Sequence, residues 1–158
     1  MIMTFLLTFL LGCVDGLRSL TPPALICWAA HFGWLHFAGT RLAFIHHRST
    51  LIVFTVLAVI ELIADKLPKT PARTAPLGLV ARICFGGACG LGVATSAGTS
   101  LFFSALLGST GGVVGAFAGY HSRHFVVSKA HVPDFVVAVV EDVIAIGGGL
   151  LILWCFAQ

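Results

Sequence analysis

Two acidic segments carry the side chains best suited to chemistry in this sequence of 158 residues. Glu61 and Asp65 lie four residues apart near the end of an apolar run that begins at Leu51, so a helix would place both carboxylates on one face. Eighty residues after Glu61, Glu141 and Asp142 interrupt another apolar run. Charged groups within hydrophobic helices are costly and often mark ion or proton paths. These four carboxylates are therefore our candidates for ion binding or transport.

Basic residues within or beside the apolar runs are candidate counter-charges for these carboxylates: Arg18, Lys66, Arg82 and Arg123. Two interpretations of such pairs stay open. Buried ion pairs can fix the register of helices and do nothing else, or they can belong to a path for ions.

The composition predicts an all-α integral membrane protein. Hydrophobic residues make up 58% of the chain and charged residues only 9%, whereas an ordinary soluble domain has roughly 25% charged residues. The net charge of +3 is scattered over short loops, so we expect a lipid bilayer as partner and no nucleic acid. We expect no cofactor and no metal site, because the adjacent His46 and His47 lack the i, i+4 spacing that presents two ligands on one helix face.

Apolar runs and helix breakers predict about six helical segments, some of them short or discontinuous. Asp15 and Gly16 are expected to end the first segment, and Pro68 follows the third. The segments are expected at about 1–14, 21–34, 50–66, 76–95, 100–120 and 133–154.

An internal repeat is predicted from the match between residues 56–63 and 136–143, which share two valines, an alanine and the glutamate at an offset of eighty. One transmembrane domain would then contain two three-helix repeats, at about 1–70 and 76–158. An odd number of crossings per repeat would insert the second repeat upside down, as in inverted-repeat transporters.

Two predicted helix starts at matching places of the repeats carry hydroxyl side chains and free backbone amides. Such ends attract anions, although ordinary capping at an interface explains the same residues. The candidates are Ser19, Thr21, Ser96, Thr99 and Ser100.

Small residues recur every four positions in the fifth segment, at Gly111, Gly115 and Gly119. This spacing lets helix backbones approach closely in lipid. It predicts a buried central helix, and it also offers a face for contact between copies of the chain.

The basic loops predict orientation. The loops after the first, third and fifth segments hold six basic residues, against two in the loop after the second segment, Arg41 and Arg48. Because basic loops stay in the cytoplasm, both termini would lie outside. The six are Arg18, Lys66, Lys69, Arg73, Arg123 and Lys129.

Charged motifs along nearly the whole chain resemble those of the bacterial membrane-protein family catalogued as domain of unknown function 4126. They are Gly16-Leu17-Arg18, the Glu-x-x-x-Asp-Lys-x-Pro segment at 61–68, Arg82, His121-Ser122-Arg123, Pro133-Asp134 and Glu141-Asp142. The resemblance implies a multi-pass protein of the bacterial inner membrane and no particular activity.

Three classes of function remain. The sequence favours a transporter or channel for a small ion or an anionic solute, with the carboxylates at the repeat interface. An enzyme acting on a lipid headgroup would use the carboxylates to hold a divalent metal, but no nucleophile and base are evident. A structural or accessory subunit would use the glycine faces to meet a partner.

Overall fold

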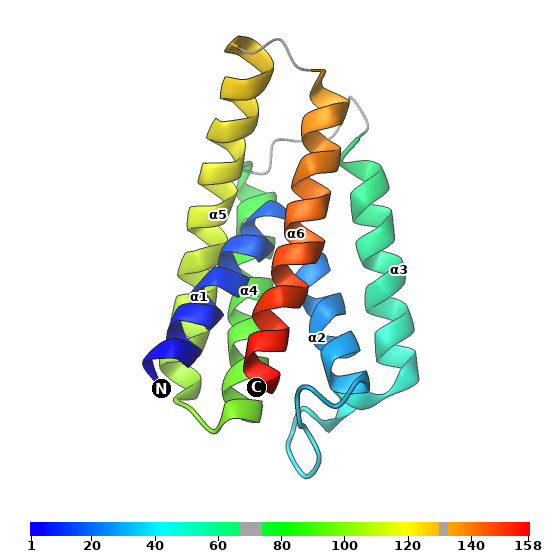
Figure 1. The fold of residues 1–158 in the computed structure, drawn as a ribbon, viewed down its shortest axis with the longest axis vertical. Helices are drawn as coiled ribbons and strands as arrows, with labels where there is room; N and C mark the ends of the chain where they lie inside the picture. The colour runs from blue at the N-terminus through cyan, green and yellow to red at the C-terminus, as the bar shows by residue number, and fades with distance from the viewer. Residues whose placement is uncertain (67–73, 130–132) are drawn as a thin grey trace.

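The computed structural model describes residues 1–66, 74–129 and 133–158. In these residues the chain forms six α-helices and one short 3-10 helix (Figure 1), so the predicted all-α fold is confirmed. The helices are α1 (Ile2–Leu17), α2 (Thr21–His31), η1 (Ala43–His46), α3 (Arg48–Ala64), α4 (Pro76–Ala97), α5 (Leu101–Lys129) and α6 (Asp134–Ala157). The predicted boundary between the repeats, with Lys69 and Arg73, lies outside the described residues.

Successive helices alternate in direction, and both termini lie at the same end of the bundle (Figure 1). The first two helices are short, with 16 residues in α1 and 11 in α2. α1 runs from the terminal end to the middle of the bundle, and α2 returns from there, so the two form a helical hairpin with both ends on the same side of the bundle (Figure 1). The corresponding helices of the two halves, such as α1 and α4, thus run in opposite directions. The symmetry between the halves stays a prediction.

Three helices of the described residues are long and apolar enough to cross a membrane: α4, α5 and α6, with 22, 29 and 24 residues. Their outer surfaces are apolar as well. In α6, for example, Val136, Val140, Val143 and Leu151 are all exposed. Apolar side chains on the outside of a helix bundle are stable against lipid tails and not against water. These are the features of a membrane protein.

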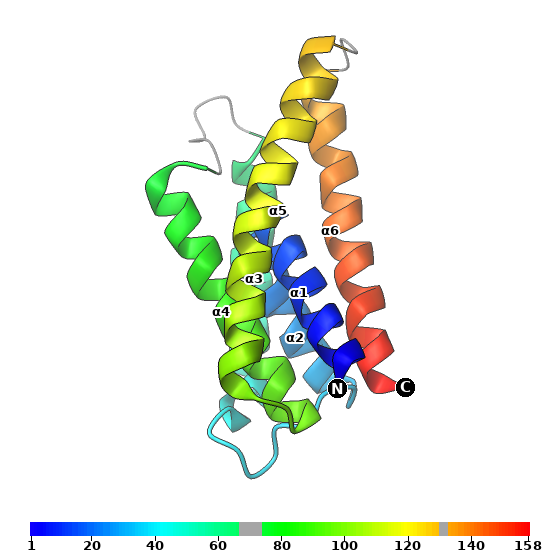
Figure 2. The ribbon, with the colours of Figure 1, turned by 90° about the vertical axis from the view of Figure 1, so that its left-hand side faces the viewer.

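Glycines bring α1, α4 and α5 into backbone contact. A Cβ on Gly86 of α4 would lie 2.5 Å from the carbonyl oxygen of Gly108 in α5, and a Cβ on Gly16 of α1 would lie 2.5 Å from that of Gly112. On the next face of α5, a Cβ on Gly115 would overlap the carbonyl oxygen of Cys13. The predicted close approach through α5 is confirmed, and Figure 2 shows α1 and α4 lying against it.

Two predictions about helix ends are wrong. Asp15 and Gly16 do not end the first helix, which continues to Leu17. Gly16 serves the packing against α5, where a side chain would meet backbone atoms. The fifth helix does not end near Tyr120 but continues to Lys129, which places Arg123 on a helix.

The glycine face predicted as a contact between copies is covered within the chain. Gly111 and Gly115 face α1, and Gly108 and Gly112 face α4. These glycines are not available to a partner, and homo-oligomerisation stays a prediction that needs another surface.

The alternating helices allow the orientation to be tested. In a cysteine-free background, Arg41→Cys in the loop after α2 should react with a membrane-impermeant maleimide added to intact cells. Lys129→Cys, at the opposite end of the bundle, should react only after the cells are permeabilised, because the basic end is expected in the cytoplasm. Labelling of Lys129→Cys in intact cells would reverse the orientation.

Candidate functional site

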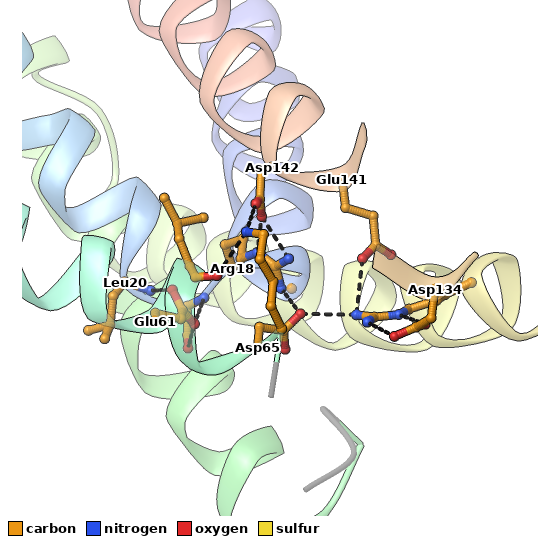
Figure 3. A network of polar contacts seen from close by, with 12 residues as sticks. Arg18, Leu20, Glu61, Asp65, Asp134, Glu141 and Asp142 are labelled. Carbon is orange, nitrogen blue, oxygen red and sulfur yellow. Dashed lines mark hydrogen bonds and ion pairs between the residues drawn. The ribbon is translucent and has the colours of Figure 1, made fainter. Parts of the chain in front are cut away.

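A break between α1 and α2 lies inside the bundle. α1 ends at Leu17, α2 begins at Thr21, and Arg18 between them has an extended backbone with φ −143° and ψ 104°. Its side chain is only 1% exposed. A buried guanidinium requires charged or hydrogen-bonding partners on its nitrogens, and helices far apart in the sequence provide them (Figure 3).

Arg18 joins α6 to the end of α3. Its Nε donates to Oδ1 of Asp142 at 2.7 Å, and its Nη2 lies 2.7 Å from the same oxygen. Its Nη1 donates to Oδ2 of Asp65. Hydrogen bonds in which both partners are charged are roughly twice as strong as neutral ones. The guanidinium therefore ties the break in the backbone to two other helices.

Both carboxylates on Arg18 are shared with a second cation. Lys66 contacts Oδ2 of Asp142 and donates to the carbonyl oxygen of Leu62 at 2.9 Å. Arg123 from α5 lies 3.0 Å from the Asp65 oxygen that Arg18 contacts. The charges form one connected network.

Arg123 extends this network to the surface. Its Nε and Nη2 donate to the two carboxylate oxygens of Asp134 at 2.8 and 2.7 Å, a bidentate pair. The Asp134 side chain is 60% exposed, whereas that of Glu141, 3.5 Å from Nη1 of Arg123, is 8% exposed. The network thus runs from a dry end at Arg18 to an exposed end at Asp134 (Figure 3).

Glu61 does not pair with a basic side chain among its described contacts, but holds the start of α2. Its Oε1 accepts hydrogen bonds from the backbone N–H and the hydroxyl of Ser19, both at 2.7 Å, and its Oε2 accepts one from the N–H of Leu20 at 2.8 Å. The first amides of a helix lack partners within the helix and carry partial positive charge. A carboxylate from α3 therefore stabilises the break from outside.

This contact bears on two predictions about binding, which stay predictions. The helix start at Ser19 was expected to attract an anion, and Glu61 was expected to bind an ion; in the structure the two groups bind each other. Thr21 does not cap the helix, because α2 has no side-chain cap and the buried hydroxyl of Thr21 has no hydrogen-bond partner among the described residues.

Arg82 lies on the other side of the break. It is 7% exposed, and it donates from Nε to the carbonyl oxygen of Gly16 and from Nη1 to that of Gly78, both at 2.9 Å. Arg82 was predicted as a counter-charge, and this stays a prediction. In the structure its side chain caps the last turn of α1.

The second predicted helix start is not equivalent to the first. α4 ends at Ala97, and Gly98 after it has a left-handed backbone with φ 63°, at the terminal end of the bundle (Figure 1). Ser96 accepts a hydrogen bond from the His36 N–H at 2.8 Å, and the Ser100 carbonyl oxygen accepts one from Ser104. The hydroxyl of Thr99 is buried without a partner among the described residues. These residues form a turn at the end of the bundle rather than a break inside it.

Comparison with known proteins identifies the family. A family model described as domain of unknown function (DUF4126) matches residues 5–155. The chain belongs to this family. No curated protein and no solved structure matches the chain.

In this DUF4126 protein the network unites residues predicted from both halves of the chain. It brings together Asp65, Asp142, Glu141, Arg18, Lys66 and Arg123, and Glu61 holds the adjoining helix start. Within the described residues, no three His, Cys, Asp or Glu side chains are grouped as ligands for a metal ion.

Two acidic residues that adjoin the site were not among the candidates, Asp15 and Asp134. Asp134 opens α6 and was assigned only to that helix start. Asp15 was assigned to a helix break, although it is the only charged side chain in an otherwise apolar segment, which is the signal that could have identified it. Five of the six acidic residues of the chain contact the charge network or the helix start beside it, and Asp15 lies one turn before Arg18 in α1.

Proposed function

We propose that this DUF4126 protein is a carrier or channel for a small ion, and that the break between α1 and α2 is the place where the ion is handled. The observation that supports this proposal is that two short helices end inside the bundle, beside a network of buried charges. Discontinuous helices of this kind expose backbone amides and carbonyls at membrane depth, and in transporters such places line binding sites.

The shared ion-pair partners in the network support the proposal that the break between α1 and α2 moves. Asp142 contacts both Arg18 and Lys66, and Asp65 contacts both Arg18 and Arg123. If Arg18 moved away, each carboxylate would keep one cation. An uncompensated buried charge is strongly destabilising, so shared partners lower the cost of rearranging the break between two states.

A structural role is the second candidate, because the described contacts of Glu61, Asp65, Glu141 and Asp142 engage each of these carboxylates. A network of this kind can hold helices in register without any transport. The enzyme alternative gains no such support, since the described residues hold no group of three His, Cys, Asp or Glu side chains for the divalent metal that it would use.

The proposal is tested by ion flux through purified protein in liposomes. We expect wild-type protein to dissipate an imposed proton or cation gradient, read by a pH-sensitive or ion-sensitive dye inside the vesicles. Glu141→Gln keeps the shape of a buried side chain and removes its charge, so it should fold and reduce the flux at least tenfold. Asp134→Asn is the matched control, because it shares Arg123 but is exposed, and it should retain most of the flux.

Two results would contradict transport. One is the absence of any wild-type flux above empty liposomes for protons, common cations and small anions. The other is a Glu141→Gln variant with normal flux, which would show that the carboxylate acts only as a tie between helices.

A further inference from the structure

Asp15 is a buried carboxyl group that the described network does not neutralise. It lies one turn before Arg18 in α1 and is 0% exposed. Neither of its oxygens has a hydrogen-bond partner of good geometry in the described part of the chain. Buried polar groups are nearly always hydrogen-bonded, and each exception calls for an explanation.

The surroundings of Asp15 leave little to solvate a negative charge. A Cβ on Gly86 of α4 would lie 3.3 Å from its Oδ2, and a Cβ on Gly112 of α5 would lie 3.4 Å from it. The carboxyl group therefore faces glycine backbone where three helices meet. An ionised carboxylate in such a place needs several donors to replace the water that it has lost.

Charged groups on the neighbouring helices act on Asp15 in opposite directions. Arg82 of α4 favours the charged form, but two of its donors go to the carbonyl oxygens of Gly16 and Gly78. Glu61 of α3 disfavours it. The thiol of Cys89 on α4 also lies within electrostatic range of Asp15. On α5, the group that faces Asp15 is the backbone of Gly112. The carboxylates of α6 have cations of their own: Glu141 contacts Arg123, and Asp142 contacts Arg18 and Lys66.

Glu61 and Asp15 are both carboxyl groups near the break, and their hydrogen-bond donors differ. The backbone of Gly86 is a donor near Asp15, but it does not form a hydrogen bond of normal geometry with it. Glu61 accepts three hydrogen bonds from Ser19 and Leu20. When two carboxylates compete in this way, the group with fewer donors takes the proton. Asp15 is that group.

A protonated Asp15 needs only one acceptor, and the packing supplies a candidate. Helix carbonyl oxygens keep a second lone pair. A Cβ on Gly112 would lie 2.7 Å from the carbonyl oxygen of Arg82 and 3.4 Å from Oδ2 of Asp15, so this carbonyl lies on the same side of Gly112 as the carboxyl group. A metal cation would require several oxygen ligands and its own volume, and the close backbone contacts favour the proton.

We propose that Asp15 is a proton-binding site at the meeting point of α1, α4 and α5, occupied by a proton in the fold described here. Release of the proton places a negative charge one turn before Arg18 in α1, within the electrostatic range of Glu61. Arg18 and Glu61 are the two residues that hold the break between α1 and α2. The charge of Asp15 thereby controls the break. This coupling to ion movement rests on the proposed function, whereas the proton site itself does not.

Infrared spectroscopy of the full-length protein in liposomes tests the site directly, because a protonated carboxyl group has a carbonyl-stretch band separate from that of a carboxylate. At pH 7 we expect this band in the wild type, and we expect it to shift when aspartate is labelled with carbon-13 at the carboxyl group. Asp15→Asn should lose the band completely and stay folded, because asparagine imitates the neutral acid. Asp134→Asn should keep the band.

A wild type without an aspartate-derived band at pH 7 would overturn the proposal, and so would a band that persists in Asp15→Asn. If Asp15→Asn does not fold, the labelled wild type alone decides. The readout is independent of transport. A band in a protein without flux would support this site and contradict the proposed function, whereas flux without the band would do the reverse.

Discussion

Replacing Gly115 by leucine is expected to remove most of the folded protein. A Cβ at this position would overlap the carbonyl oxygen of Cys13 and lie 2.8 Å from its carbonyl carbon. Both atoms belong to the backbone of α1, which cannot turn aside as a side chain can. Overpacking typically costs about 1–3 kcal/mol, and here it also moves α1 away from α5, so we expect the upper end of this range or more.

The measurement is thermal unfolding in detergent, together with the yield of monodisperse protein. Gly148→Leu is the matched control, because Gly148 is also a helical glycine but a Cβ there has no described neighbour within 4 Å. It should be neutral or stabilising, since glycine is a poor helix former. Equal stability of the two variants would show that α1 and α5 are not held by this contact.

The helical fold could be predicted because its cause lies in local composition. A chain with few charges and long apolar runs can satisfy its backbone in a membrane only as helices or a closed barrel, and the breakers between the runs predicted six segments. The ends were less predictable. Asp15 and Gly16 read as a break, because their use in packing depends on α5, which begins more than eighty residues later.

The membership of the site was largely predictable, and its connections were not. Intramembrane charges are few, so each was a candidate. The sequence could not show that Glu61 binds the amides before Thr21, because that contact depends on α1 ending in the middle of the bundle. The sequence also suggested that the helix starts near Ser19 and Ser100 are equivalent, since both carry hydroxyl side chains and lie at matching places of the predicted repeats. The two differ in their depth in the bundle, which the sequence does not show.

The close packing and the charge network act on the same element. Glycines fix α1 against α4 and α5 up to Gly16, and two residues later Arg18 is held by carboxylates from other helices. A helix that is fixed along its length and ends in a network with shared partners has one movable point, which is the break. Variants at Gly115 should therefore affect folding, whereas variants at the break should affect folding together with the proposed ion movement.

Arg18→Met is expected to destabilise the protein by about 3–5 kcal/mol, the usual cost of removing one partner from a buried ion pair. Methionine fills much of the same volume but leaves Asp65 and Asp142 without the cation that links them. Lys66 and Arg123 remain on these carboxylates, which places the expected loss nearer to the lower value. Urea titration of the protein in detergent gives the free energy of unfolding.

The double variant Arg18→Met/Asp142→Asn separates charge from packing. If the loss comes from a carboxylate that keeps only one of its two cations, removing the charge of Asp142 should restore at least about 1 kcal/mol relative to Arg18→Met alone, since the effects of residues in direct contact are not additive. Asp134→Asn, whose carboxylate is exposed, should restore nothing in the same background. An Arg18→Met variant that loses less than about 1 kcal/mol would behave as an exposed pair does, and the break would then be held by Glu61 and the glycine contacts instead of by Arg18.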